Sequence, residues 1–274
     1  MKKIIILLFS FIALYAQDAF VSAEYLRNSF DDKNLVVIDI SDSYKMSHID
    51  GAISFDVHYL IDKEKSNNAL KSPRRIQEIF GNIGLSDDSH VIIYGRNDFE
   101  DFKRATFLAF VLISSGFEEV RILDGGYMSW IFEYDSLVTK EVRILDSHKI
   151  TLKPKKISID NKILKNISKR NLLLDARDSE SYVNGHIQGA KNSPYRDKFL
   201  RDYTLISSEK LQDYYLRKLQ ISLNDIIVYS DDIFTSSLEW FIVNRVMGFR
   251  SAKIYYNSFT DYKDLGLKIS SYKQ

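Results

Sequence analysis

The chain has 274 residues, which is long enough for two domains of roughly 130 residues that each bury a core of their own. Hydrophobic residues make up 45% and charged residues 27%, a balance that excludes a disordered chain and fits a soluble globular protein. The 38 basic and 37 acidic residues nearly cancel, so charge gives no reason to expect a nucleic-acid partner. No cysteine is present, which excludes lipoprotein acylation and any reaction that needs a thiol of this chain.

Residues 1–16 are a predicted signal peptide. Lys2 and Lys3 supply its positive charge, residues 4–14 its apolar stretch, and Ala13 to Ala16 a cleavage site. This apolar stretch is too short to cross a bilayer as a helix, which takes about 20 residues. We therefore expect export to the periplasm and no stable membrane span once the leader is removed.

A first domain is expected over residues 20–138. Its first strand, Leu35–Ile40, has four consecutive apolar residues before Asp39, which is typical of a strand covered on both faces of a parallel sheet. A helix over residues 74–80 follows Ser72 as N-cap and Pro73 as first residue. The later elements are a strand at 91–94, a helix over 104–115 that Gly116 ends, and a strand at 120–123.

Residues 139–169 lack a periodic apolar pattern and are rich in lysine, which predicts a connector; within it, residues 150–152 could pair as an edge strand. A second domain over residues 170–268 repeats the earlier order. Its elements are strands at 172–175, 226–229 and 252–255 and helices near 208–219 and 236–247. Strands that alternate with helices predict the α/β class, with a mostly parallel sheet flanked by helices in each domain.

The strongest motif in the chain occurs twice. The pattern Tyr-x-x-x-His-Ile-x-Gly-Ala spans residues 44–52 and again residues 182–190, each time after a strand that ends in Asp. Together with the later strands, this motif recurs about 135 positions on, so the chain is a tandem duplication, although the Asp124-Gly125-Gly126 turn is replaced by Tyr256-Asn257-Ser258 in the second repeat. This ordered set resembles the rhodanese family, and two copies in tandem resemble the thiosulfate and 3-mercaptopyruvate sulfurtransferases.

The resemblance implies a catalytic cysteine at the start of one loop in each repeat. This loop follows the strand at 91–94 in the first repeat and the strand at 226–229 in the second. That thiol would carry sulfur as a persulfide, in a cradle of backbone N–H groups that also holds an anionic donor. Here the position falls on Gly95 in the first repeat and on Ser230 in the second. A serine hydroxyl cannot hold sulfur as a persulfide. We therefore expect a protein that is catalytically silent as a sulfurtransferase.

The loop of the second repeat is nevertheless a candidate ligand-binding site. Its residues are Ser230, Asp231, Asp232, Ile233, Phe234, Thr235 and Ser236. By the same resemblance, Arg177 would help to hold a substrate anion; the alternative is a structural salt bridge with Asp178 or Glu180. Asp231 and Asp232 place two negative charges where an anionic donor would sit, and like charges at 4–6 Å disfavour binding by on the order of 1 kcal/mol.

Other polar residues carry weaker signals. His48 and His186 hold the same turn position in both repeats, which favours a ring bonded to backbone over catalysis. The remaining histidines share no spacing typical of a metal site, so we expect neither metal nor cofactor. The Asp124-Gly125-Gly126 turn lacks the glycine order of a dinucleotide site.

Three functions remain open. The first is a binding or interaction module in the handling of sulfur compounds, whose partner is an unknown protein or a small anionic or sulfur-containing ligand. The second is an enzyme that uses Ser230 in a reaction without a persulfide, with Asp231 or Asp232 as base and with help from His186. The third is a purely structural subunit of a larger assembly.

Overall fold

The computed structural model describes residues 19–65, 69–96, 98–135, 137–164, 171–221 and 225–272. The predicted signal peptide at residues 1–16 lies outside these ranges. The chain divides into two compact units, one of residues 19–155 with 201–204 and the other mainly of residues 156–200 and 205–274. Within the described ranges, no helix is both long and apolar enough to cross a membrane.

The first unit is built on a five-stranded sheet in the order β1-β6-β5-β2-β4, in which every neighbouring pair is parallel. The strands are β1 (Phe20–Val21), β2 (Leu35–Asp39), β4 (Ile53–Ser54), β5 (His90–Tyr94) and β6 (Val120–Leu123). β3 (His48–Ile49) pairs with β7 (Val138–Thr139) in a separate antiparallel ladder. The predicted parallel sheet is thus confirmed for the first repeat.

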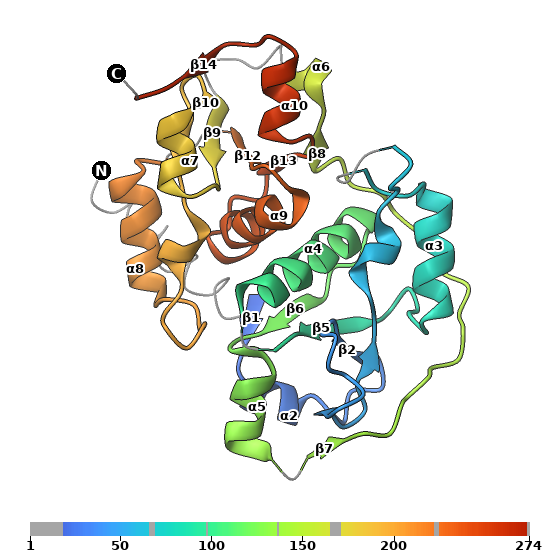
Figure 1. Cartoon of the computed structure of the whole chain (residues 1–274). Coiled ribbons are helices and arrows are strands. Elements are labelled where there is room, and N and C mark those ends of the chain that lie inside the picture. The colour runs from blue at the N-terminus through green and yellow to red at the C-terminus, as the bar shows by residue number, and fades with distance from the viewer. Residues whose placement is uncertain are drawn as a thin grey trace, which may run out of the picture. The chain divides into compact units, whose positions relative to one another are not determined.

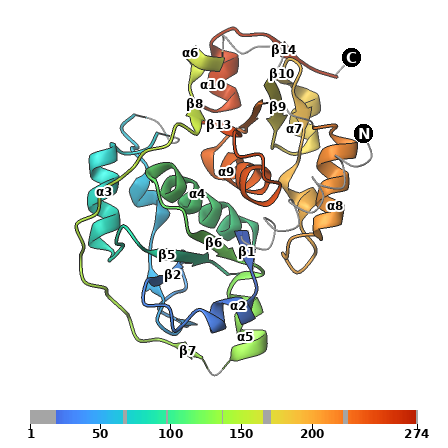
Figure 2. The same ribbon diagram turned by 180° about the vertical axis from the view of Figure 1, so that it is seen from behind.

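Helices cover both faces of this sheet, which is why its central strands are apolar throughout. α4 (Phe99–Ser115) lies on one side, whereas α2 (Ala23–Asn28) and α5 (Gly126–Tyr134) lie on the other (Figures 1 and 2). Ile38 and Ile93 are fully buried as a result. The unit is completed by α3 (Pro73–Asn82), with Ser72 as its N-cap, and by the 3₁₀ turn Val57–Leu60.

The second unit repeats this topology strand for strand. Its sheet order, β11-β9-β12-β13-β8, is again entirely parallel. The strands are β8 (Ser158–Ile159), β9 (Asn171–Asp175), β11 (Lys191–Asn192), β12 (Asp225–Tyr229) and β13 (Lys253–Tyr255), and β10 (His186–Ile187) pairs antiparallel with β14 (Ile269–Ser270). The tandem α/β architecture predicted from the motif repeat is confirmed.

Helices again flank the second sheet. They are α6 (Asn161–Leu164), α7 (Ser179–Asn184), α8 (Ser208–Gln212), α9 (Ile233–Phe241) and α10 (Phe259–Asp264), with the 3₁₀ turn η2 at Tyr195–Lys198. α8 and α9 each continue as a π-helical turn, to Lys218 and to Val246. The helices α7 and α10 share a core with one face of the sheet, where Tyr229 and Tyr255 are fully buried.

Two predicted helices begin earlier than expected, and each begins directly after an aspartate that caps it. α4 starts at Phe99 rather than at residue 104, and α9 starts at Ile233 rather than at residue 236. The side chains of Asp98 and Asp232 accept the N–H of the residue three positions on, at 2.8 Å in each case. Aspartate is a strong N-cap, so these carboxylates set where each helix begins.

Residues 139–155, the first part of the expected connector, lie along the first unit. The His148 N–H donates to the Gly81 carbonyl at 2.9 Å and the Lys153 N–H to the Ser115 carbonyl at 2.8 Å. The Thr151 N–H donates to the Asp87 carboxylate at 2.8 Å. Residues 140–157 are therefore attached to the first unit by isolated hydrogen bonds and form no strand. The edge strand predicted at 150–152 does not form.

Candidate functional site

Strands β9 and β12 are neighbours in the second sheet and run parallel, with Asp175 opposite Tyr229 at their carboxyl ends. The loop that carries Arg177 and the loop that begins at Ser230 therefore leave the sheet at the same edge. In open α/β sheets this edge is where ligands bind. Arg177 and Ser230, which lie 53 positions apart in the sequence, are thus brought to the same edge by strand pairing.

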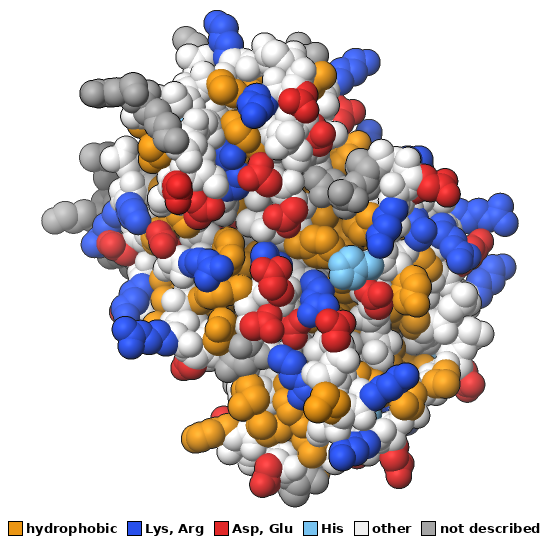
Figure 3. Space-filling view, viewed as in Figure 1, with side chains coloured by type: hydrophobic (Ala, Val, Ile, Leu, Met, Phe, Trp, Pro, Cys, Tyr) orange, Lys and Arg blue, Asp and Glu red, His pale blue; other side chains and the backbone are white. Residues whose placement is uncertain are grey.

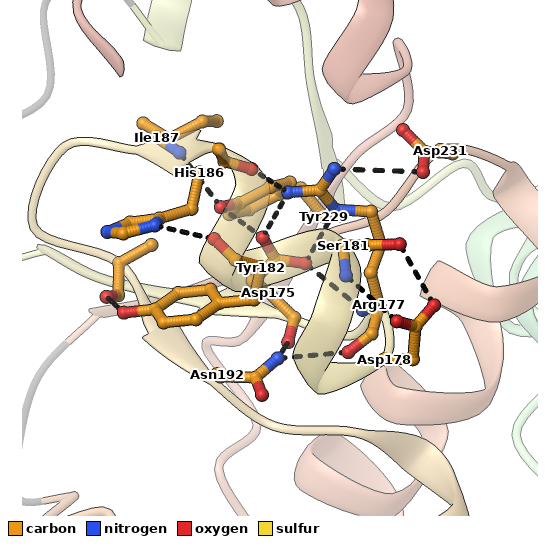
Figure 4. Close-up of polar contacts among 12 residues, drawn as sticks. Asp175, Arg177, Asp178, Ser181, Tyr182, His186, Ile187, Asn192, Tyr229 and Asp231 are labelled. Carbon is orange, nitrogen blue, oxygen red and sulfur yellow. Dashed lines mark hydrogen bonds and ion pairs between the residues drawn. The ribbon is translucent and has the colours of Figure 1, made fainter. Parts of the chain in front are cut away.

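Arg177 is held in place by a buried carboxylate. Its Nε lies 2.9 Å from Asp175 Oδ1 and its Nη2 lies 2.6 Å from Asp175 Oδ2, where Tyr229 also donates its hydroxyl at 2.7 Å (Figure 4). The Arg177 guanidinium stacks on the Phe259 ring at 3.8 Å and donates to the Gly185 carbonyl at 2.7 Å. Although burial lowers the pKa of Arg177, the hydrogen bonds and charge of Asp175 raise it above its ordinary value.

The expected salt bridge of Arg177 therefore exists, but with a different partner. Asp175 takes the place predicted for Asp178 or Glu180. Asp178 instead caps α7, since its carboxylate accepts the Ser181 N–H and hydroxyl at 2.9 Å each. The sequence could not reveal this, because Asp178 is nearer to Arg177 in the chain than the carboxylate that the strand geometry presents.

The loop after β12 encloses a hollow of about 220 Å³. Its lining residues are Arg177, Asp178, Pro194, Tyr195, Arg196, Ser230, Asp231, Asp232 and Thr235. Ser230 is only 2% exposed and lies between the end of β12 and the first turn of α9. Of the predicted candidates, Ile233, Phe234 and Ser236 do not line the hollow.

Four lining residues were missed by sequence reasoning. Asp178 begins α7, and Pro194, Tyr195 and Arg196 come from the segment between β11 and the end of η2. This segment carries no motif and no periodic pattern, so nothing in the sequence tied it to the loop at 230. The turn η2 contacts α9, and this packing is what brings it to the hollow.

Asp231 is the most exposed carboxylate of the loop, with half of its side chain accessible. Its Oδ2 lies 3.7 Å from Arg177 Nη1 (Figure 4). Burial of the other half raises the pKa of Asp231, and the charges of Asp175, Asp232 and Asp178 raise it further, whereas Arg177 opposes them. The carboxylates around Ser230 are therefore close enough to repel one another.

The corresponding loop of the first unit is filled by its own chain. Asp101, which is 2% exposed, folds back so that its carboxylate accepts the Arg96 N–H at 2.5 Å and pairs with Arg104. A Cβ atom on Gly95 would lie 2.5 Å from the Asp101 Cβ atom. Thr235 occupies the position of Asp101 in the second unit, three residues past the helix cap, and leaves the equivalent space to Ser230.

The two motif histidines have the structural role that was predicted. His48 Nδ1 lies 2.8 Å from the Tyr44 carbonyl oxygen, and His186 Nδ1 lies 2.9 Å from that of Tyr182. Each ring also stacks on the tyrosine of its own motif, at 3.7 and 3.9 Å between ring centroids. The bonds to backbone are therefore confirmed. Across the described ranges, no group of three or more His, Asp or Glu side chains is arranged to hold a metal ion.

Comparison with known families decides the relationship that the motifs suggested. The profile of the rhodanese-like domain matches residues 22–133 and, a second time, residues 160–265. The chain belongs to the rhodanese-like family. It is a tandem member, and it lacks the cysteine at both positions where the resemblance places one.

Relatives of this rhodanese-like chain span nearly its whole length. A protein of Mycobacterium leprae, described provisionally as a thiosulfate sulfurtransferase, is 26% identical over 90% of this chain and 95% of its own. The sulfur carrier protein TtuD of Thermus thermophilus is 24% identical over 90% of this chain and 94% of its own. The likeness to these relatives therefore spans both rhodanese-like domains of this chain.

Among solved structures, wild-type EanB superposes with a TM-score of 0.82 at 19% identity, covering 95% of this chain and 71% of EanB. The anaerobic ergothioneine biosynthesis enzyme of Chlorobium limicola, in complex with trimethyl histidine, gives a TM-score of 0.78 at 20% identity, over 91% of this chain and 69% of that one. At this identity the likeness establishes the fold alone.

The cap of α9 provides a first test of the site geometry. Asp232 accepts both the Thr235 N–H and the Thr235 hydroxyl at 2.8 Å, so Asp232→Ala should lower the free energy of unfolding by about 1 kcal/mol. Asp232→Asn keeps an accepting oxygen and should lose only a few tenths of that amount. Urea denaturation followed by Trp240 fluorescence in a Trp130→Phe background measures both variants. Equal losses would show that the charge, and not the cap, is what matters.

Proposed function

We propose that this protein is an exported, periplasmic rhodanese-like protein that does not transfer sulfur and that uses the hollow beside Ser230 to bind a ligand. The observation that carries the proposal is a formed site without its nucleophile. Ser230 stands at the cysteine position, nearly buried, at the edge of a hollow that Arg177 and the start of α9 complete. The chain contains no cysteine elsewhere that could replace it.

Export rests on the leader alone. Lys2, Lys3 and the apolar stretch at 4–14 have the pattern of a secretory signal. Nucleic acid is not among the proposed partners. On the face drawn in Figure 3, basic side chains are interspersed with acidic ones and form no field of a single sign, such as a phosphate backbone would need.

A sulfurtransferase assay tests the central part of the proposal. With thiosulfate or 3-mercaptopyruvate as donor and cyanide as acceptor, we expect no turnover by the purified wild-type protein. Ser230→Cys should also stay silent with thiosulfate, because Asp231 and Asp232 disfavour an anionic donor beside residue 230. Ser251→Cys, which places a thiol at an exposed position of the second unit, controls for background thiol chemistry.

The outcomes separate the possible causes. Turnover by wild type that disappears in Ser230→Ala would contradict the proposal. Turnover by Ser230→Cys alone would show that the hollow still accepts a sulfur donor and that only the nucleophile is missing. If neither the wild-type protein nor any variant shows turnover, the loop itself binds a different ligand.

The structure gives less support to a Ser230-dependent enzyme. A serine nucleophile needs a base within about 3.2 Å of its hydroxyl. The Asp232 carboxylate is engaged by Thr235, and His186 Nδ1 is engaged by the Tyr182 carbonyl. The Asp231 carboxylate is not engaged in this way, but within the described part of the chain no hydrogen bond joins it to the Ser230 hydroxyl. Treatment with an active-site-directed serine reagent tests this second candidate function. Covalent modification of Ser230 would support an enzyme that uses Ser230 as its nucleophile.

A further inference from the structure

The hollow beside Ser230 carries an excess of negative charge. Its charged lining residues are Arg177, Arg196, Asp178, Asp231 and Asp232. Arg177 is already balanced by the buried Asp175, which accepts its Nε and Nη2 at 2.9 and 2.6 Å. Three carboxylates then remain against the exposed Arg196.

Two of these carboxylates act as the N-caps of helices. Asp178 accepts the Ser181 N–H at 2.9 Å and caps α7, and Asp232 accepts the Thr235 N–H at 2.8 Å and caps α9. Asp231 differs from both. Its closest ion-pair partner, Arg177 Nη1, lies at 3.7 Å, which is longer than a hydrogen bond, and half of the Asp231 side chain is accessible. Its oxygens are thus available to a ligand.

Ser230 contributes a second polar group to the same hollow. The residue is 2% exposed and lines the hollow, yet its hydroxyl makes no hydrogen bond to any residue in the described part of the chain. The Ser230 oxygen is not among the side-chain atoms that are both buried and without a partner, so it is accessible from the hollow, and its hydrogen bonds are left to water or to a ligand there. Ser230 and the neighbouring Asp231 therefore offer a hydroxyl and a carboxylate, side by side, to one occupant.

We propose that the hollow binds the protonated amino group of a small molecule, with Asp231 as the charged acceptor and the Ser230 hydroxyl as the neutral one. An ammonium group has three N–H donors and a compact positive charge, which this pair of acceptors and the surplus carboxylates match. The inference rests on the proposed binding function. It names the class of ligand, which carries a positive charge, whereas a thiosulfate-type donor carries a negative one.

The size of the hollow limits the rest of the molecule. A volume of about 220 Å³ has room for about seven water molecules at roughly 30 Å³ each. This is below the roughly 300 Å³ at which pockets for drug-sized ligands begin. Only the amino end of a larger molecule, or a whole molecule of a few heavy atoms, fits there.

Protein-observed NMR titration with ethylammonium chloride tests the inference directly. At constant ionic strength we expect saturable shifts of the amides at 230–235, and no comparable saturation with sodium thiosulfate. Asp231→Asn, which keeps the shape of the side chain, should weaken ethylammonium binding about tenfold, as expected for the loss of one charge-assisted hydrogen bond. Ser230→Ala should weaken it by a smaller factor.

The matched control is Asp213→Asn, which removes another exposed carboxylate of an Asp–Arg pair and does not line the hollow. It should leave the ethylammonium Kd unchanged. The inference is overturned if ethylammonium does not saturate, if thiosulfate binds more tightly, or if Asp231→Asn binds as well as wild type. None of these results depends on sulfur transfer, so a failure here is distinguishable from turnover in the sulfurtransferase assay.

Discussion

Glu239→Ala should lower the free energy of unfolding of the second unit by about 3–5 kcal/mol. Glu239 and Lys198 are both fully buried, and Lys198 Nζ lies 2.8 Å from Glu239 Oε2. Glu239 Oε1 also accepts the hydroxyls of Ser193 and Tyr215, at 2.6 and 2.9 Å. Burial lowers the pKa of Lys198 and the charge of Glu239 opposes this, so removing Glu239 would leave a buried cation without its counter-charge.

This pair also holds the wall of the ligand hollow. Lys198 Nζ donates to the carbonyl of Pro194 at 2.7 Å, and Pro194 lines the hollow together with the next two residues. We therefore expect Glu239→Ala to disturb the amides at 230–235 as well as stability. The two effects share one cause, because the segment that the ammonium ion of Lys198 fixes is part of the site.

The measurement uses one tryptophan per unit. Trp240 belongs to the second unit and Trp130 to the first, so urea denaturation in a Trp130→Phe background follows the second unit alone. Lys198→Met with Glu239→Leu should regain most of the loss, since an apolar pair can replace a buried ion pair. Asp213→Ala, in an exposed pair with Arg217, should cost no more than about 1 kcal/mol. A loss below 1 kcal/mol in Glu239→Ala would contradict the prediction.

Gly95→Ala should destabilise the first unit by about 1–3 kcal/mol, whereas Ser230→Ala at the equivalent position should be nearly neutral. A Cβ atom on Gly95 would lie 2.5 Å from the Cβ atom and 2.7 Å from the Oδ2 atom of Asp101, so the buried helix α4 would have to shift. At position 230 the side chain already has its space, and its hydroxyl lies against the hollow.

A double-mutant cycle separates the clash from other effects. Asp101→Ala removes the carboxylate that fills the first loop, and Gly95→Ala should then cost much less than it does alone. Urea denaturation in a Trp240→Phe background follows the first unit through Trp130. Additive losses would contradict the close packing of residues 95 and 101. A smaller cost in the double variant would thus show that Asp101 occupies, beside Gly95, the space that the hollow takes up beside Ser230.

Much of the fold could be predicted from local patterns. The apolar runs at 35–38 and 226–228 became central strands of parallel sheets, because strands covered on both faces must be apolar throughout. The repeat of the motif with histidine predicted two domains of equal topology. Helix starts were less predictable, because the apolar patterns at 104–115 and 236–247 do not show that Asp98 and Asp232 cap helices that begin several residues earlier.

The site itself was predictable only in part. Ser230 and the residues after it were located by their order after an apolar strand, and Arg177 by its position after another. Which carboxylate holds Arg177, and which residues form the far wall of the hollow, depend on strand register and on the packing of η2 against α9. Neither leaves a periodic trace in the sequence.

The sequence by itself determined that this chain has two rhodanese-like repeats and no thiol, because strand patterns, motif order and the absence of cysteine are local facts. Only the tertiary structure decided that the first loop is closed by Asp101 and that the second remains open beside Ser230. It also decided that Asp175 neutralises Arg177 and leaves Asp231 available. The physical reason is that burial and charge balance arise from contacts between segments far apart in the chain, and these contacts exist only once the sheets have paired.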